Sequence, residues 1–131
     1  MIALTDLDQI AAARVEDAKV LLTAARFDSA LYVCGYAVEL ALKARIRRTL
    51  HWPGFPMTRK EFEGYSSFRT HDLDVLLHLC GREVKIRQNH FFPWSAVALW
   101  SPDARYRSIG SVTQGDARAM ITATAALLKV L

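Results

Sequence analysis

The sequence predicts an all-α protein: an up-and-down bundle of four to five helices, three of them long and one or two short. Three observations lead to this prediction. Long stretches carry apolar residues at three- and four-residue steps, which is the period of an amphipathic helix. No stretch shows the two-residue alternation of a half-buried strand. Prolines and glycines gather between the periodic stretches, as in HWPGFP at residues 51–56.

Size and composition are those of one folded domain over residues 1–131. The hydrophobic fraction is 52% and the charged fraction is 23%, which excludes a disordered chain. The formal net charge of +4 permits an acidic partner such as RNA without requiring one. The net charge alone therefore does not identify a binding surface, and candidate residues have to be identified individually.

The ends and the cysteines indicate a cytoplasmic protein. The N-terminal MIALTDLDQI lacks the basic start and apolar run of a signal peptide. No apolar run approaches the 18 or so residues that a membrane span needs, so no membrane contact is expected. Cys34 and Cys80 both lie in apolar helical contexts, and we expect buried free thiols in a reducing compartment.

The first helix is expected from about Asp6 to Arg26, with Thr5 and Asp8 as a capping box. A short break then makes the next helix its antiparallel neighbour. The apolar face of this first helix consists of Leu7, Ile10, Ala11, Val15, Ala18, Leu21 and Leu22.

A central helix is expected from Asp28 to His51, about 22 residues and roughly 33 Å long, capped by Asp28 or Ser29. Glu39 and Lys43 are four residues apart, in the favoured order for an ion pair, and we expect them to serve structure or site organisation. The buried stripe of this helix is Leu31, Cys34, Val38, Ala41, Leu42 and Ile46. Its last two turns carry the cations Lys43, Arg45, Arg47 and Arg48.

The segment after the central helix is expected to be irregular and then briefly helical. Thr58 and Glu61 form another capping box, which predicts a short helical turn, and residues 63–70 indicate a surface loop. Thr70 is expected to cap a short helix over residues 71–80, with Gly81 in a left-handed conformation at its end.

The last third of the chain contains one more long helix. Residues 82–92 favour no single structure, and Pro93 fits the first turn of a short helix that ends near Trp100. Residues 101–111 are expected to form a loop. Thr113 and Asp116 form a capping box for a final helix over residues 114–131.

The run ARFDSALYVCGYAVELALKARI, followed by HDLDVLL and WSPDARY, resembles the HEPN family (higher eukaryotes and prokaryotes nucleotide-binding domain). The most specific part of the match is Ala30, Tyr32, Gly35, Tyr36, Glu39, Leu42, Lys43 and Ala44. The resemblance implies a four- or five-helix bundle that is usually a homodimer. Some members are the toxin-like or accessory half of a toxin–antitoxin pair and are encoded beside a small nucleotidyltransferase, which would then be the partner protein.

Active members of that family are metal-independent ribonucleases. Their motif is an arginine, four to six residues and a histidine near the start of the last long helix. Here no histidine follows Arg105 or Arg107, so weak or absent cleavage is expected. Arg45 and His51 have the right spacing at the end of the central helix. They are candidates for phosphate clamp and general base; the alternative is a solvated helix cation and a helix-terminal residue.

The candidate residues for RNA or nucleotide binding are cations with one aromatic among them: Lys43, Arg47, Arg48, Arg105, Tyr106 and Arg107. The alternative is an ordinary solvated helix end and a loop anchored by Arg105 and Tyr106. Gly35, Tyr36 and Glu39 are expected to organise the site. His71, Asp74 and His78 share one helical face, but a capping or packing role is favoured over a metal site, and no cofactor is expected.

The favoured function is a HEPN-type domain that binds RNA or a partner protein. The alternatives are a small-ligand module that binds a free nucleotide in a basic pocket at a dimer interface, and a plain protein-interaction bundle. A homodimer is also expected from the small residues Ala30, Cys34, Gly35 and Ala37, which permit close approach of another helix.

Overall fold

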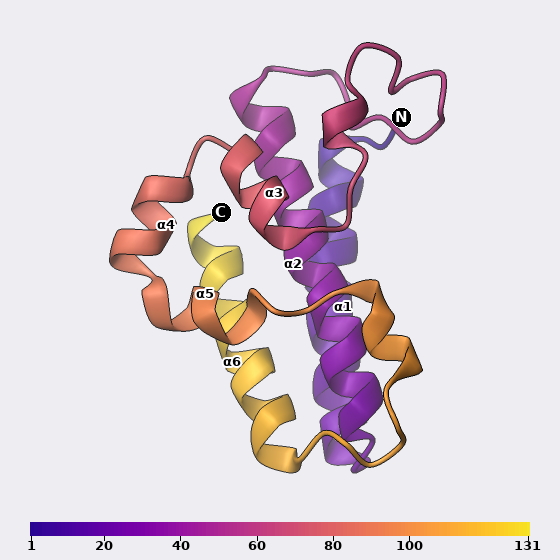
Figure 1. The fold of residues 1–131 in the computed structure, drawn as a ribbon, viewed down its shortest axis with the longest axis vertical. Helices are drawn as coiled ribbons and strands as arrows, with labels where there is room; N and C mark the ends of the chain where they lie inside the picture. Colours follow the sequence, from indigo (N-terminus) through magenta and orange to yellow (C-terminus); the bar gives the residue numbers. More distant parts are fainter.

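The computed structural model describes residues 1–131 and is all-helical, which confirms the predicted fold class (Figure 1). The three long helices are α1 (Leu4–Thr23), α2 (Phe27–Thr49) and α6 (Gln114–Val130). Three short helices, rather than one or two, follow α2: α3 (Leu73–Leu79), α4 (Glu83–Asn89) and α5 (Phe91–Val97). Two 3-10 helices, η1 (Ser66–Phe68) and η2 (Pro102–Tyr106), lie in the connections. None of the helices combines the length and the apolar character needed to cross a membrane.

Helix α2 is the centre of the bundle. It packs along α1 and against α6, α3 and η2, while α5 packs on α6 (Figure 1). The predicted stripe of α2 is largely correct, because Cys34, Val38, Leu42 and Ile46 are fully buried. Leu7 and Ala18 of α1 and Leu127 of α6 complete the same core. Burial of these apolar side chains from three helices is the main favourable contribution to folding.

Two of the expected helix starts are wrong. α1 begins at Leu4 with Ala3 as the N-cap, so Thr5 does not cap it. The chain just before Ala3 is held by an isolated antiparallel bridge between Ile2 and Phe55, with N–O distances of 2.7 and 2.8 Å. α2 begins at Phe27, and its N-cap Arg26 has no side-chain cap.

The remaining capping predictions are mostly confirmed. Both bonds of the Thr113 and Asp116 box form, at 3.0 and 3.1 Å. Thr58 and Glu61 also bond reciprocally, at 3.0 and 3.2 Å, and the Phe62 amide donates to the Thr58 carbonyl at 3.2 Å, which closes the expected short turn. The cap of α3 is Asp72 and not Thr70, whose hydroxyl accepts from the Asp72 amide instead.

Two helices end on unusual residues. Ala25 after α1 and His51 after α2 have φ angles of 58° and 55°, where glycine is normally found. In each case the next residue closes the turn, because the Arg26 amide donates to Leu21 and the Trp52 amide donates to Arg47. These are Schellman motifs. Gly81 occupies the equivalent position after α3, with φ 79°, as predicted.

The small residues expected at a dimer contact lie inside the monomer. Ala30, Cys34 and Ala37 are fully buried, and Gly35 faces Trp100. A Cβ atom on Gly35 would lie 2.0–2.1 Å from the indole ring. The close approach that these residues permit is therefore made by Trp100 of the same chain. The homodimer itself stays a prediction.

Candidate functional site

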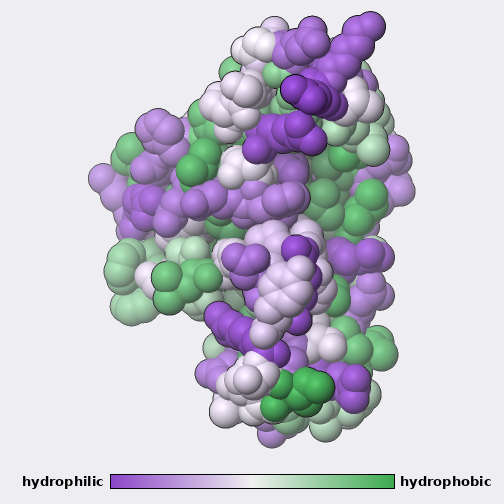
Figure 2. Space-filling view, turned by 45° about the vertical axis from the view of Figure 1, so that its right-hand side comes forward, coloured by the Kyte–Doolittle hydropathy of each residue, from purple (hydrophilic) through white to green (hydrophobic).

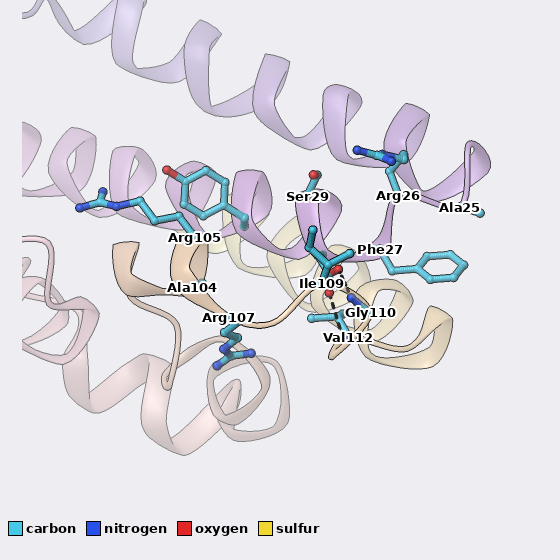
Figure 3. A pocket seen from close by; sticks show the side chains of 12 residues that line it. Ala25, Arg26, Phe27, Ser29, Ala104, Arg105, Arg107, Ile109, Gly110 and Val112 are labelled. Carbon is cyan, nitrogen blue, oxygen red and sulfur yellow. Dashed lines mark hydrogen bonds between the residues drawn. The ribbon is translucent and has the colours of Figure 1, made fainter.

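A solvent-open cleft of about 480 Å³ lies at the end of the bundle where α1 turns into α2 (Figure 3). One wall comes from the turn and the first residues of α2, including Arg26, Ser29 and Tyr32. The other wall comes from η2 and the loop that follows it, including Arg105 and Arg107. The cleft thus joins two segments that are far apart in the sequence.

Asp28 holds the two walls together. Its carboxylate accepts hydrogen bonds from the Gly110 amide at 2.7 Å and from the Val112 amide at 3.0 Å. This bonding explains why Asp28 does not cap α2: its two oxygens are used by the loop. Amide bonds to a charged acceptor are stronger than neutral ones, so they fix the loop on the first turn of α2.

Three arginines, Arg26, Arg105 and Arg107, border the cleft. Figure 3 shows their guanidinium groups pointing in different directions and not converging on one point. Hydrogen bonds to Tyr106 and Tyr32 raise the pKa of the Arg105 guanidinium. Arg26 is absent from the residues selected by sequence, because it belongs to the short break between helices and to no recognisable motif.

Two large exposed side chains lie beside the loop arginines: Tyr106 is between Arg105 and Arg107, and Ile109 follows them. The guanidinium of Arg105 lies 4.8 Å from the centre of the Tyr106 ring, in a cation–π contact. Tyr106 is 75% exposed and Ile109 is fully exposed. The alternative interpretation of Tyr106 as a core anchor is therefore wrong, and its ring is open to solvent.

A row of polar side chains runs along α2 from the cleft: Tyr32, Tyr36, Glu39 and Lys43. Figure 2 shows hydrophilic side chains over much of the face that it draws, with apolar ones near its lower end. The hydroxyl groups of Tyr32 and Tyr36 are 3.3 Å apart. This contact, together with burial and the charge of Glu39, raises the pKa of Tyr36 to about 12, while the charge of Arg105 opposes the shift.

Glu39 is the buried acid of this row, with only 3% of its surface exposed. Its Oε1 accepts from Lys43 Nζ at 2.6 Å and lies 2.9 Å from His71 Nδ1. Its Oε2 is buried without any hydrogen-bond partner. His71 arrives from the segment before α3, so the contact joins residues that are 32 positions apart. Sequence reasoning placed Glu39 in the site but missed its histidine partner.

Asp74 and His78, which share a helical face with His71 in the sequence prediction, have partners of their own. Asp74 pairs with Arg87 at 3.2 Å, and His78 Nδ1 lies 2.8 Å from Glu83. With His71 on Glu39, the three residues contact three different groups. The capping or packing role that the sequence favours is wrong, because the side chains of His71 and His78 are 63% and 77% exposed and the N-cap of α3 is Asp72.

The cations at the end of α2 are largely used within the fold. Arg45 donates two hydrogen bonds to the Leu131 carbonyl, at 2.8 and 2.6 Å, and burial lowers the pKa of its guanidinium. Arg48 pairs with Asp8, and Arg47 is 3.5 Å from the Pro53 carbonyl. His51 is exposed, and its backbone ends the helix. Arg45 and His51 share no bonding partner.

Comparison with family models, with curated proteins and with solved structures finds no match to this chain. The resemblance to the HEPN family rests on the residues quoted above.

Proposed function

We propose that this protein is a HEPN-type helical domain that binds single-stranded RNA along the cleft between the α1–α2 turn and η2. The observation that carries the proposal is the set of three arginines at the rim, next to an exposed aromatic ring. Arginine donates two parallel hydrogen bonds to phosphate, and an exposed tyrosine offers a stacking surface for an unpaired base.

The directions of the arginines favour a strand over a free nucleotide. The phosphates of one nucleotide are adjacent, so a nucleotide pocket needs donors that converge. Arg26, Arg105 and Arg107 point apart in Figure 3, which suits successive phosphates of a chain. The end of α2 contributes less than the sequence suggests, because Lys43, Arg45 and Arg48 are paired within the protein.

The test is fluorescence anisotropy with a labelled single-stranded RNA, measured over a range of salt concentrations. Replacing both Arg105 and Arg107 by alanine should weaken binding. It should also reduce the slope of log affinity against log salt by about 1.4, or about 0.7 for each lost phosphate contact. His51→Ala should leave the RNA affinity nearly unchanged, because His51 lies just beyond the other end of α2 and does not line the cleft.

A matched control removes the same charge elsewhere. Arg59 and Lys60 are exposed in the turns near the N-terminus, at the opposite end of the bundle from the cleft (Figure 1). The R59A/K60A variant should retain the affinity for RNA and most of the slope of log affinity against log salt. Equal losses in both double variants would mean unspecific attraction to a basic protein. Tight binding of AMP or ATP that displaces the RNA would instead favour the small-ligand alternative.

A further inference from the structure

Helix α5 leaves large apolar side chains open to solvent. Phe92 and Leu99 are 83% and 90% exposed, and Phe91 is exposed as well. Trp94 and Val97 are buried in the main core, where α5 packs on α6 (Figure 1). The helix thus has one side that the fold covers and one that it leaves open.

The open side of α5 has the composition of an interface. Phe92, Ala96 and Leu99 are spaced four and then three residues apart, which places them along one side, and all three are exposed. The Ser95 hydroxyl donates to the Phe91 carbonyl at 2.8 Å, so its proton is used within the helix. No other α-helix of this protein lacks a charged residue. A helix that is uncharged all round is normally buried, which indicates that a partner covers α5.

The part of the chain that contains α5 carries all of the net charge. Residues 1–81 contain ten Lys and Arg and ten Asp and Glu, whereas residues 82–131 contain seven and three, a net charge of +4. The second range comprises α4, α5, η2 and α6. The excess of positive charge therefore lies on α4, η2 and α6, of which α4 and α6 pack against α5.

The unpaired charges of these neighbours are mainly cations. Lys85 of α4 and Arg118 of α6 are exposed and take part in no ion pair. Among the three acids of this part of the chain, Glu83 is bonded by neighbouring side chains and Asp116 by the capping box, which leaves Asp103. The open face of α5 is thus an apolar surface between cationic helices.

We infer that the open face of α5 binds an acidic amphipathic helix of another protein. The inference does not depend on RNA binding and gives the molecule a second surface. Interfaces between proteins commonly have a centre without charge that is rich in aromatic side chains, with polar groups around it. Cations at the edge of such a centre select a partner that carries Asp or Glu beside its apolar residues.

RNA and a second copy of this chain fit the face less well. RNA is recognised through hydrogen bonds and base stacking, but Ala96 and Leu99 are aliphatic and the open side has no free hydrogen-bond donor. A second copy would bring the same unpaired cations, Lys85 and Arg118, to the contact.

The length of the face suits about two turns of a partner helix. Phe92 and Leu99 are seven residues apart, which is about 10 Å at the rise of a helix. A helix with apolar residues at positions i, i+4 and i+7 presents a stripe of the same length. Acidic residues on both sides of that stripe would face α4 and α6.

The experiment measures binding of a fluorescent amphipathic peptide to the full chain by anisotropy. The peptide carries leucine at every third or fourth position and glutamate at the others. We expect saturable binding, and the double variant F92S/L99S should weaken it by about tenfold or more. Both side chains are largely exposed, so this variant should keep its melting temperature. The matched control is Val20→Ser, because Val20 is an exposed apolar residue of α1, and it should retain the affinity.

The charge of the partner is tested with a second pair of variants. K85E/R118E should weaken binding of the glutamate peptide and strengthen binding of a peptide with lysine in place of glutamate. R59E/K60E makes the same change of charge in the turns near the N-terminus and should leave both affinities nearly unchanged.

Several outcomes would overturn the inference. These are absence of peptide binding, equal binding of the glutamate and lysine peptides, and binding that F92S/L99S leaves unchanged. Tighter binding to vesicles of anionic phospholipid than to the peptide would assign the face to a lipid surface. A dimer in sedimentation that F92S/L99S dissociates would assign it to a second copy. F92S/L99S should retain the RNA affinity of the unmodified protein, and a loss would place RNA on this face instead.

Discussion

Gly35 and Trp100 show how one residue without a side chain shapes the middle of the fold. The indole of Trp100 occupies the space of the missing Cβ, donates from Nε1 to the Tyr32 carbonyl at 3.1 Å, and packs edge-on against Tyr36 with ring centres 4.9 Å apart. Trp100 lies two residues before the start of η2 in the chain. The contact therefore places η2, and with it Arg105, beside α2.

Gly35→Ala should lower the free energy of unfolding by about 1–3 kcal/mol, because the new methyl group has to displace Trp100. Urea denaturation followed by circular dichroism measures the loss. The matched control is Gly115→Ala in the first turn of α6, where a Cβ meets only the Thr113 hydroxyl at 3.7 Å. An unchanged unfolding midpoint for Gly35→Ala would mean that Trp100 moves aside at no cost.

Two residues, Glu39 and Arg26, show which contacts cannot be predicted from the sequence. Glu39 stands out from the sequence because it lies four residues before Lys43 on a predicted helix. Its contact with His71 depends on the path of the chain from α2 to α3, about which local patterns carry no information. The place of Arg26 could not be predicted either, because only the folded chain brings it to the cleft with Arg105 and Arg107.

Helix ends in this protein carry a conformational cost. Ala25 and His51 both adopt the left-handed conformation, which costs residues with a Cβ atom roughly 1–2 kcal/mol relative to the right-handed one. Glycine avoids this cost but loses more backbone entropy on folding. Replacing Ala25 or His51 by glycine thus removes conformational strain and adds an entropy cost. We expect the relief of strain to be the larger of the two.

Ala25→Gly and His51→Gly should each raise the free energy of unfolding by about 0.5–1 kcal/mol. Thermal melts of the single variants measure the gain. Gly81→Ala is the opposite change at an equivalent position, with φ 79° and a Cβ 2.9 Å from Thr49 Cγ2, and should be destabilising. Loss of stability in Ala25→Gly would show that backbone entropy outweighs the relieved strain.

Whole elements are more predictable than their boundaries. The prediction of the last helix is correct, including its start, because the capping box of Thr113 and Asp116 depends only on two residues three positions apart. The start of α1 was wrong because the Ile2–Phe55 bridge, which no local pattern contains, fixes the chain before it. Asp28 failed as a cap for the same reason: its partners are more than 80 residues away.

At the scale of the whole molecule, stability should fall in acid. Hydrogen bonds from the N-terminal amine and from the Met57 and Thr58 amides lower the pKa of Glu61 from 4.5 to about 2, and bonds to His78 and to Thr113 lower the pKa values of Glu83 and Asp116. A pKa that is lower in the folded state stabilises the protein above the unfolded value. That contribution is lost as pH falls through the folded value.

The unfolding midpoint in urea should therefore decrease as pH is lowered from about 5 toward 2. Glu61→Gln should flatten this decrease, because it removes a carboxyl group whose pKa is lowered to about 2 in the folded protein. Asp103→Asn is the control, since the Asp103 carboxylate takes part in no ion pair, and it should leave the slope unchanged. If the urea midpoint of Glu61→Gln falls with pH as steeply as that of the unmodified protein, the stabilising role given to the Glu61 carboxylate is wrong.

The bonds from Asp28 to the loop at Gly110 and Val112 have a kinetic consequence. They close a ring of 82 residues or more, which contains α2, α3, α4 and α5. The entropy of closing such a ring is lost before the bonds repay it, so contacts of this kind form after the local helical hairpins. We therefore expect the cleft to assemble late in folding, so that a partly folded chain lacks the proposed binding site.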